Sequence, residues 1–424
     1  MLIRASSEGR ARVKINMDYI ARVEGEATVK LEIADGELKE LKLNIWEPPR
    51  FFEGFLRGRR FEEAPDIVSR ICGICPVSHM ATSIRAIEKA IGFVPNEEIA
   101  RIREIMSLSQ IASSHIVHLY VLALPDYHRL PMIVGMDTEI ARLIRIKTVL
   151  NRLTAVFGGR ALHPVAMIVG GFTKVPERDE IAGLLAALED IRADVLDTVR
   201  MIAGLALPDL RTEPEYVALR KAGGYGINEG KIISSLGMSL DEDDYLDAFE
   251  EREVSYANAK RTVIKGRGSM MVGALSRLNL NMEYLHPVAR AIAEEVGFSS
   301  PSFNPYLNNL AQAIETVHCY SRCIELLDLV TGKDAFLPVT VREGFGSAVT
   351  EAPRGLLCHQ YQISRRGVIE KANVITPTAH NFLSLEEALR KLVNENIAMQ
   401  HEELTLKCEM LVRAYDPCFS CSVH

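Results

Sequence analysis

The chain lacks the features of several common protein classes. It has no run of 18 or more apolar residues, the length that a membrane-spanning helix needs, because the nearest candidate, residues 155–172, is broken by Arg160, His163 and Pro164. Residues 1–16 contain no apolar stretch of the secretory-signal kind. With 49 basic and 56 acidic residues, the chain also lacks the basic surplus of a nucleic-acid-binding protein. These absences predict a cytoplasmic protein with no membrane span and no nucleic-acid partner.

Two further absences concern cofactors. The sequence has neither a Gly-x-Gly-x-x-Gly segment nor a phosphate-binding loop, so any flavin or nicotinamide nucleotide is expected to bind on another chain. Four of the eight cysteines, Cys319, Cys323, Cys358 and Cys408, form no cluster of the kind that holds an iron–sulfur centre. Cys319 and Cys323 share one face of an expected helix beside His318, a spacing compatible with a metal clip. We expect all four to be buried thiols instead, since free cysteine is among the most buried residue types.

The composition and patterning predict a large, mainly helical protein with a smaller β portion (α+β). A chain of 424 residues with 48% hydrophobic and 25% charged residues is expected to fold as a single large domain. Apolar residues alternate with polar ones on both sides of Asp35-Gly36, which predicts a β-hairpin within an N-terminal β region of about residues 11–47. The glycine-rich and acidic segment at about residues 208–265 predicts a surface subdomain, and its acidic run Asp241–Asp244 a solvated face.

Helical periodicity accounts for most of the remaining chain. Asn96 is expected to cap a helix with Glu97 and Glu98 in its first turn, and Ser384 with Glu387 forms a capping-box pattern at the start of another. The expected architecture is a bundle of long helices. The five stretches are residues 96–124, 138–157, 179–205, 309–330 and 384–415.

The strongest local signals are two Cys-x-x-Cys pairs at opposite ends of the chain, Cys72/Cys75 and Cys418/Cys421. Two intervening residues place both sulfurs on one side of a turn, close enough to share a metal. A four-thiolate zinc site is the simplest interpretation, although its pairs usually lie within tens of residues of each other. A thioredoxin-like redox pair would leave the second motif unexplained. The third interpretation is a catalytic nickel or iron site, which soft thiolate ligands suit. The spacing alone leaves zinc and a redox metal equally open.

The wider pattern resembles that of nickel–iron hydrogenase large, catalytic subunits. Residues 70–79 read Arg-x-Cys-Gly-x-Cys-x-x-x-His, and residues 416–424 read Asp-Pro-Cys-x-x-Cys-x-x-His, which together are similar to the paired signature of that family. A related subunit of respiratory complex I lacks the cysteine pairs, so that resemblance is rejected. Four other segments fall, in the right order, where the family carries functional residues: Arg22–Gly25, Arg50–Glu53, Glu351–Gly355 and Thr376–Thr378.

The resemblance implies a metal centre with defined ligands. Cys72 and Cys418 would be terminal thiolates on nickel, and Cys75 and Cys421 would bridge nickel to iron. The iron would also carry carbon monoxide and cyanide, which maturation factors install. A second metal ion, magnesium or iron, would be bound by Glu53, the backbone carbonyl of Val374 and His424, since hard oxygen ligands with one imidazole suit such an ion.

The resemblance also assigns roles around these metals. Arg354 and the hydroxyl of Thr378 occupy the positions that face the cyanide ligands. Pro353 and Leu357 would wall the iron ligands off from water. When dihydrogen is split heterolytically, the thiolate of Cys418 would take the proton and Glu24 would relay it outward. His79 would donate a hydrogen bond to Cys75.

Details of the sequence indicate which group of this family the chain resembles more. The aspartate that many respiratory relatives carry before His-x-x-His is Ser114 here, which leaves that aspartate's role without a residue. His115 and His118 are as readily packed helix histidines as functional ones. Together with the Ser-Cys-Ser-Val-His ending, this variant is more similar to the cytoplasmic NAD(P)-linked group. An ending at His424 is expected for a mature form whose C-terminal extension has been cleaved, or for a gene that stops there.

The function expected from the resemblance is reversible oxidation of dihydrogen at the nickel–iron centre. Electrons would pass to an obligate small subunit that carries iron–sulfur clusters, and from there through diaphorase-type subunits to NAD(P). One alternative is the same centre coupled to a deazaflavin or another cytoplasmic acceptor. The other is a zinc-stabilised scaffold protein without catalytic activity.

Overall fold

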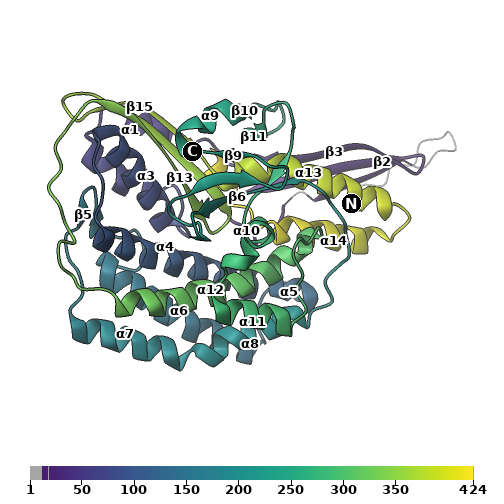
Figure 1. The fold of residues 1–424 in the computed structure, drawn as a ribbon. Helices are drawn as coiled ribbons and strands as arrows, with labels where there is room; N and C mark the ends of the chain where they lie inside the picture. Colours follow the sequence, from purple (N-terminus) through teal and green to yellow (C-terminus); the bar gives the residue numbers. More distant parts are fainter. Residues whose placement is uncertain (1–11, 18, 424) are drawn as a thin grey trace.

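Long helices form one side of the molecule and small β-sheets the other (Figure 1). The computed structural model describes residues 12–17 and 19–423. The expected class, mainly α with a smaller β portion, is confirmed. The helical side is formed by α4 (Glu97–Val117), α6 (Asp137–Gly158), α7 (Arg178–Asp190), α8 (Arg192–Ala203), α10 (Ala274–Asn281), α11 (Pro287–Glu295) and α12 (Asn308–Asp328).

Helix α4 is the centre of the helical side, packed against both α6 and α12. Its start follows the prediction, because the side chain of Asn96 accepts a hydrogen bond from the amide of Ile99 at 2.9 Å. A π-helical turn at His118–Ala123 and the short α5 (Leu124–Tyr127) continue the same rod. The whole rod, Glu97–Tyr127, is long and apolar enough to cross a membrane, but 83% of its most apolar window is buried inside the protein. A helix that is buried to this extent belongs to the core of the folded protein.

Two of the expected helices are interrupted where periodicity gives no sign. The stretch 179–205 is divided at Ile191, a buried residue at φ −97° that separates α7 from α8. The stretch 384–415 is also two helices, α13 (Pro377–Glu395) and α14 (His401–Ala414). The capping box at Ser384 is wrong, since its hydroxyl donates to the carbonyl of Asn381 within α13. The helix starts earlier because Pro377, at its first position, needs no amide partner.

The N-terminal β region is a three-stranded antiparallel sheet in the order β1 (Arg12–Met17), β2 (Ala27–Ala34), β3 (Glu37–Ile45). The predicted turn is present, and both Asp35 and Gly36 have positive φ, 56° and 75°, as a tight two-residue hairpin requires. The sequence predicted the β2–β3 hairpin but not the pairing of β1 with β2. The apolar side of β3 faces α13.

A second three-stranded sheet positions the residues near the cysteines. It consists of β13 (Gly344–Ala352), β14 (Gly355–Ile363) and β15 (Ile369–Ile375), all antiparallel. The tight connection between β13 and β14 is Pro353-Arg354, and α13 follows directly after β15. Helix α3 (Pro76–Ile91) packs across β13 and β14. Two short helices, α1 (Phe52–Leu56) and α2 (Ala64–Ser69), precede α3.

Residues 208–265 form small sheets over the β side of the molecule (Figure 1). Much of β6 is buried, and a core cluster joins its Val217 and Leu219 to Val349 of β13. In the acidic run, Asp241, Asp243 and Asp244 are exposed, but Glu242 accepts hydrogen bonds from Arg85, Lys89 and the amide of Val349. The strands are β6 (Glu215–Lys221), β7 (Gly224–Tyr225), β8 (Lys231–Ser234), β9 (Ser239–Leu240), β10 (Phe249–Arg252), β11 (Arg261–Ile264) and the nearby β12 (Met270–Met271); α9 is Tyr245–Ala248, and β4 (Met167–Ile168) pairs with β5 (Gly171–Phe172) elsewhere.

Candidate metal centre

The first cysteine pair lies in the turn between α2 and α3. Cys75 is the N-cap residue of α3 and is followed by Pro76, so the helix begins directly after the pair. The amides of Ile74 and Cys75 point at the sulfur of Cys72, at 3.3 and 3.4 Å. Both cysteines are buried, with 1% and 5% of their surface exposed. The turn thus holds two thiols in the interior with backbone donors around one of them.

The second pair lies in the segment after α14. The amide of Cys418 donates to the hydroxyl of Thr378 at 2.8 Å, at the first turn of α13. Glu24 pairs with Cys418 as an isolated parallel β-bridge, and its carbonyl accepts from the amide of Phe419 at 2.8 Å. Gly25 permits this approach, because a Cβ there would lie 2.6 Å from the nitrogen of Ser420 and its φ is +84°. The N-terminal segment therefore fixes the position of the C-terminal cysteines.

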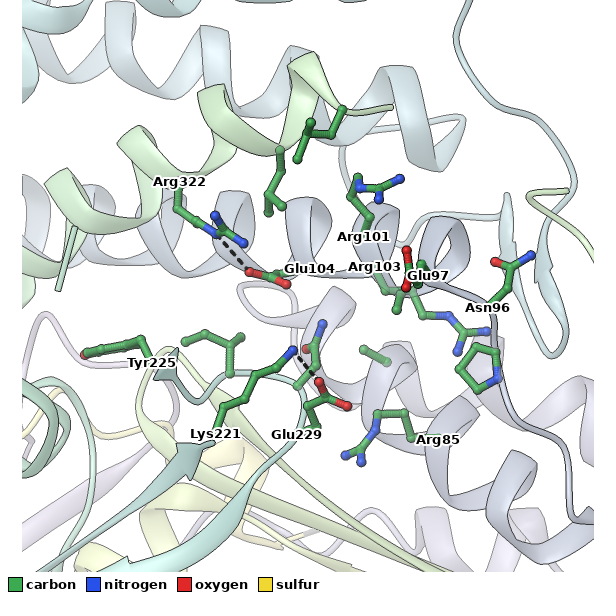
Figure 2. Close-up of a pocket in the computed structure, with 17 residues that line it drawn as sticks. Arg85, Asn96, Glu97, Arg101, Arg103, Glu104, Lys221, Tyr225, Glu229 and Arg322 are labelled. Carbon is green, nitrogen blue, oxygen red and sulfur yellow. Dashed lines mark hydrogen bonds and ion pairs between the residues drawn. The ribbon is translucent and has the colours of Figure 1, made fainter. Parts of the chain in front are cut away.

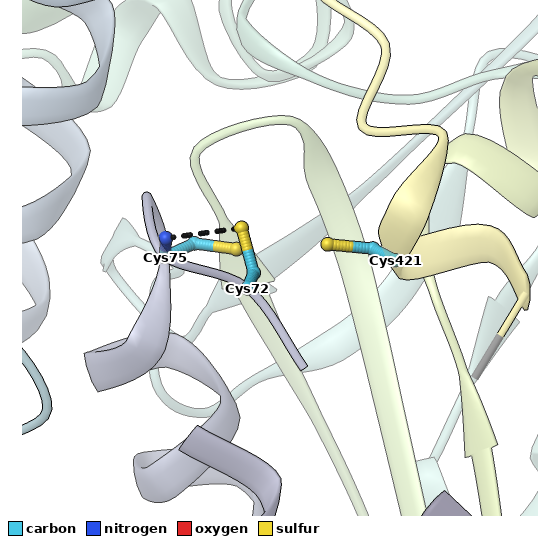
Figure 3. A group of neighbouring side chains, drawn as sticks. All are labelled: Cys72, Cys75 and Cys421. Atoms are coloured by element: carbon cyan, nitrogen blue, oxygen red, sulfur yellow. Dashed lines mark hydrogen bonds between the residues drawn. The ribbon is translucent and has the colours of Figure 1, made fainter. Parts of the chain in front are cut away.

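The fold brings both pairs to one point. The sulfurs of Cys72 and Cys418 are 3.6 Å apart, and those of Cys418 and Cys421 are in direct contact as a disulfide. The sulfurs of Cys72, Cys75 and Cys421 lie within 4.8 Å of one another and face a common centre (Figure 3). Four converging sulfurs, once reduced, are a soft donor set that fits nickel and iron.

Electrostatics at the pair Cys72/Cys75 favours metal binding. The hydrogen bond with Cys75 lowers the pKa of Cys72, and the same bond together with burial raises the pKa of Cys75. Of the two thiols, Cys72 is therefore the more readily deprotonated, and a bound metal would displace the protons of both.

A buried arginine stands beside the cysteines, as predicted. The Nε of Arg354 donates to the carbonyl oxygen and to Oδ1 of Asp416, at 2.8 and 3.0 Å. Burial alone would lower the pKa of Arg354, but the Asp416 carboxylate and the thiols of Cys72 and Cys75 outweigh it and raise the pKa. Its buried Nη1 has no protein partner among the described residues. A permanent cation with a spare donor fits an anionic ligand such as cyanide.

The other predicted wall residues are also buried. Thr378 is 5% exposed, and because its oxygen accepts from the Cys418 amide, its own proton is left to donate. Leu357 is fully buried in β14, and Pro353 is buried in the turn beside Arg354.

Glu24 contacts the C-terminal pair through its side chain. Its Oε2 lies 2.8 Å from the sulfur of Cys418, within hydrogen-bond reach of the thiol once the disulfide is reduced. Oε2 also accepts from the amide of Ser420 at 3.3 Å, and Oε1 accepts from the hydroxyl of Ser420. A carboxylate in direct hydrogen-bond contact with a thiol is placed to receive its proton.

The remaining predicted positions are arranged as follows. His79 lies one turn into α3, and its Nδ1 is 3.2 Å from Nε2 of His359. The Oε1 of Glu53 accepts from the amide of Val374 at 2.8 Å, so these two residues are neighbours. His424 lies outside the described residues. The bond from His79 to Cys75 and the second metal ion stay predictions.

Comparison with known proteins identifies the family. A family model for nickel-dependent hydrogenase matches residues 50–145 and 328–424. The sulfhydrogenase 1 alpha chain from Pyrococcus furiosus is 38% identical over 419 residues, which cover 97% of each chain. The chain belongs to the nickel-dependent hydrogenase family.

Other relatives agree with this membership. An F420-non-reducing hydrogenase chain from Methanothermobacter marburgensis is 29% identical, across 97% of this chain and 95% of its own. The structure of an NAD+-reducing [NiFe]-hydrogenase has a TM-score of 0.90 at 26% identity, covering 97% of this chain and 99% of that one. The [NiFeSe]-hydrogenase of Dm. baculatum shares the fold, with a TM-score of 0.79 at 23% identity and coverage of 98% and 100%. This hydrogenase chain is therefore a catalytic large subunit with a nickel–iron centre.

Sequence reasoning missed residues that hold the hydrogenase centre together. Arg50 donates to the carbonyls of Ile71 and Ser420, which clamps the two cysteine segments to each other. Arg277 is fully buried, and its guanidinium donates to Glu351, to Glu315 and to the carbonyls of Ala352 and Pro353. Arg50 had a signal, because it lies in a recognised segment, whereas nothing local distinguishes Arg277.

The histidines of α4 and of the turn after it belong to buried polar networks. The Nε2 of His115 lies 2.7 Å from Oε2 of Glu315, and His118 contacts Gln312 and the carbonyl of Arg413. Gln312 in turn donates to Asp416 at 2.9 Å. His118 thus supports, through Gln312, the carboxylate that holds Arg354. The hydroxyl of Ser114 is buried without a hydrogen-bond partner in the described part of the protein.

The four other cysteines are fully buried, as expected: Cys319, Cys323, Cys358 and Cys408. Burial raises the pKa of each of these thiols, which is the behaviour of inert core cysteines.

A large cavity lies apart from the cysteines. It measures about 430 Å³ and is lined by ion pairs, Lys221 with Glu229 at 2.5 Å and Arg322 with Glu104 at 3.3 Å (Figure 2). None of the four cysteines of the two Cys-x-x-Cys pairs lines it. The four cysteines are buried in the interior, apart from this cavity.

Proposed function

We propose that this hydrogenase oxidises dihydrogen reversibly at a nickel–iron centre held by Cys72, Cys75, Cys418 and Cys421, and that its electrons pass through an iron–sulfur small subunit to NAD(P). The convergence of four buried sulfurs with a carboxylate on one of them is the observation that carries the proposal. Cys72 and Cys418 would be terminal on nickel, and Cys75 and Cys421 would bridge to iron.

The protein's own residues have distinct tasks at this centre. The bound metals would supply the open coordination position at which dihydrogen is polarised and split heterolytically. The thiolate of Cys418 takes the proton, and Glu24, whose Oε2 is 2.8 Å from that sulfur, receives it next. Ser420 donates to both oxygens of Glu24 and keeps the carboxylate aimed at Cys418.

The iron would also carry carbon monoxide and cyanide, installed by maturation factors. The spare donors of Arg354 and Thr378 support this assignment, because two cyanide ligands are anionic and need donors in a buried site. Leu357 and Pro353 exclude water from the same side. Glu53 and the carbonyl of Val374, with His424, would bind magnesium or a second iron as a structural ion.

An exposed apolar surface next to the first cysteine pair supports an obligate small subunit. Phe51, the N-cap residue of α1, and Phe55, within that helix, are 68% and 60% exposed. Leu162 and Val165 are also exposed, and His163 between them contacts the carbonyl of Ser69 at the end of α2. Exposed aromatic and aliphatic residues of this kind mark an interface. Its place beside the Cys72 turn would bring a partner's cluster close to the metals.

The electron acceptor is proposed from the relatives. A solved relative is an NAD+-reducing hydrogenase, which favours diaphorase-type partners, flavin and NAD(P) in a cytoplasmic complex. Coupling of the same centre to a deazaflavin or another cytoplasmic acceptor is the second candidate. Among the relatives are a sulfhydrogenase chain and an F420-non-reducing hydrogenase chain, so similar sequences belong to hydrogenases of different types.

The test is to purify the native complex and identify its components. We expect a cluster-bearing small chain together with a flavin-binding diaphorase, and dihydrogen-dependent reduction of NAD+ or NADP+. Reduction of a deazaflavin without either nicotinamide nucleotide would replace the proposed acceptor. A complex carrying stoichiometric zinc and no nickel would support a non-catalytic scaffold and contradict the proposal.

A further inference from the structure

A chain of four buried side chains runs from the cysteine turn into the sheet. The Nδ1 of His79 lies 3.2 Å from Nε2 of His359, and the Nδ1 of His359 lies 2.9 Å from the hydroxyl of Tyr361. That hydroxyl donates to the hydroxyl of Ser83 at 3.0 Å. His79 is 1% exposed and the other three are fully buried. A row of polar groups this deep in the core is maintained only when its hydrogen bonds are made.

The chain is anchored at both ends on α3, the helix that begins after Cys75. His79 lies one turn after Cys75, and its amide donates to the carbonyl of that cysteine at 3.4 Å. Ser83 lies one turn further along the same helix, whereas His359 and Tyr361 are two residues apart in β14. Side chains two residues apart in a strand point to the same face, so β14 presents both to α3. The position of His79 relative to Cys75 is thereby tied to the sheet.

The proton arrangement along the chain has two consistent forms for neutral imidazoles. Burial raises the pKa of Tyr361, which therefore keeps its single hydroxyl proton. If Tyr361 donates to Ser83, as its geometry indicates, then His359 donates to Tyr361 through Nδ1 and accepts from His79 through Nε2. In the reverse form every bond changes direction, and His79 carries its proton on Nε2. In the first form, Nε2 of His79 has no proton and cannot donate to Cys75, whereas in the second form it has one. The direction of the Tyr361 hydrogen bonds therefore decides whether His79 can donate to Cys75.

We propose that His359 and Tyr361 are positioning residues of the hydrogenase centre, which fix the ring orientation and tautomer of His79 and thereby the hydrogen bonding of the Cys75 thiolate. The inference rests on the proposed function, in which Cys75 is a metal ligand, and on the predicted hydrogen bond from His79 to the sulfur of Cys75. Hydrogen bonds to a metal-bound sulfur withdraw charge from it, and loss of an outer partner of a metal ligand commonly lowers activity about 10- to 100-fold.

The test is Tyr361→Phe in the intact complex, which removes one hydroxyl and keeps the buried ring. Tyr320→Phe in α12 is the matched control, because Tyr320 is also buried and its hydroxyl donates to the carbonyl of Leu188 at 2.9 Å. We expect Tyr361→Phe to shift the infrared bands of the iron-bound diatomic ligands and to lower turnover about 10- to 100-fold at unchanged nickel content. We expect the control to leave the bands in place.

A second pair of variants covers the case in which Tyr361→Phe does not fold. His359→Gln retains one hydrogen-bond acceptor and one donor, whereas His359→Ala retains neither. The glutamine variant should therefore show a smaller shift of the infrared bands and a higher turnover than the alanine variant. Bands of Tyr361→Phe and His359→Ala that coincide with those of the unmodified enzyme would overturn the inference. If the unmodified complex itself had no nickel and no such bands, the proposed function would fail instead.

Discussion

Replacement of Glu24 by glutamine tests the proton path with the least change in shape. The carboxylate accepts two hydrogen bonds from Ser420, and its Oε2 lies 2.8 Å from the sulfur of Cys418. A glutamine oxygen in the place of Oε1 still accepts from the hydroxyl of Ser420, although the amide of Ser420 loses the oxygen to which it donates. The amide group that replaces Oε2, in contrast, has no lone pair for the proton on Cys418.

The expected loss of catalytic rate equals the contribution of one positioned acid–base group. Such a group contributes a factor of about 100 to 10,000, which corresponds to roughly 3 to 5 kcal/mol of activation free energy. We therefore expect Glu24→Gln to reduce dihydrogen-dependent dye reduction by about that factor while the nickel content per chain stays the same. Glu26→Gln, two residues along, is the control and is expected to keep full turnover. Turnover of Glu24→Gln within about twofold of the unmodified enzyme would exclude Glu24 from the proton path.

Three further perturbations address the ligands, the backbone and the pH dependence. Cys418→Ser should prevent nickel retention, measured by metal analysis, because a hard hydroxyl replaces a soft thiolate; a fully active serine variant would disprove the ligand role. Gly25→Ala should also lower the nickel content, because the new Cβ would lie 2.6 Å from the nitrogen of Ser420. Gly36→Ala is the control, since Gly36 has a similar positive φ but open space around it. It should lower the free energy of unfolding by only about 1 kcal/mol and retain nickel. Burial lowers the pKa of His318 from 6.5 to about 4, and its Nδ1 accepts from the amide of His286. Between pH 6.5 and 4, the unfolded chain therefore binds a proton at His318 that the folded chain does not bind. The free energy of unfolding consequently keeps its full value above pH 6.5 and falls by about 3 kcal/mol as the pH falls towards 4. Melting temperatures should fall less from pH 7 to pH 5 in His318→Asn, and an equal fall in both proteins would contradict the assignment.

The sequence predicted the fold class and the centre for separate physical reasons. Long periodic stretches such as residues 97–117, with a capping asparagine, specify their helices locally. The breaks at Ile191 and between α13 and α14 were missed because no glycine or proline marks them within the stretch. The strands β13 and β14 were missed because they are buried on both faces, so their residues do not alternate as a half-exposed strand does.

The sequence predicted those residues of the candidate site whose side-chain type and surrounding motif indicate their role. The four cysteines, Arg354 and Thr378 were placed by their motifs, and the structure brings them together. Arg277 could not be predicted, because its role depends on carbonyls and carboxylates that only the fold collects around it. The same holds for His359 and Tyr361, which read as ordinary strand residues until α3 is packed across β14.

Metal analysis of the purified complex, combined with infrared spectroscopy, tests the central claim most directly. We expect one nickel per chain, iron in the same centre, and about three infrared bands from diatomic ligands on that iron. Stoichiometric zinc, with no nickel and no such bands, would contradict it.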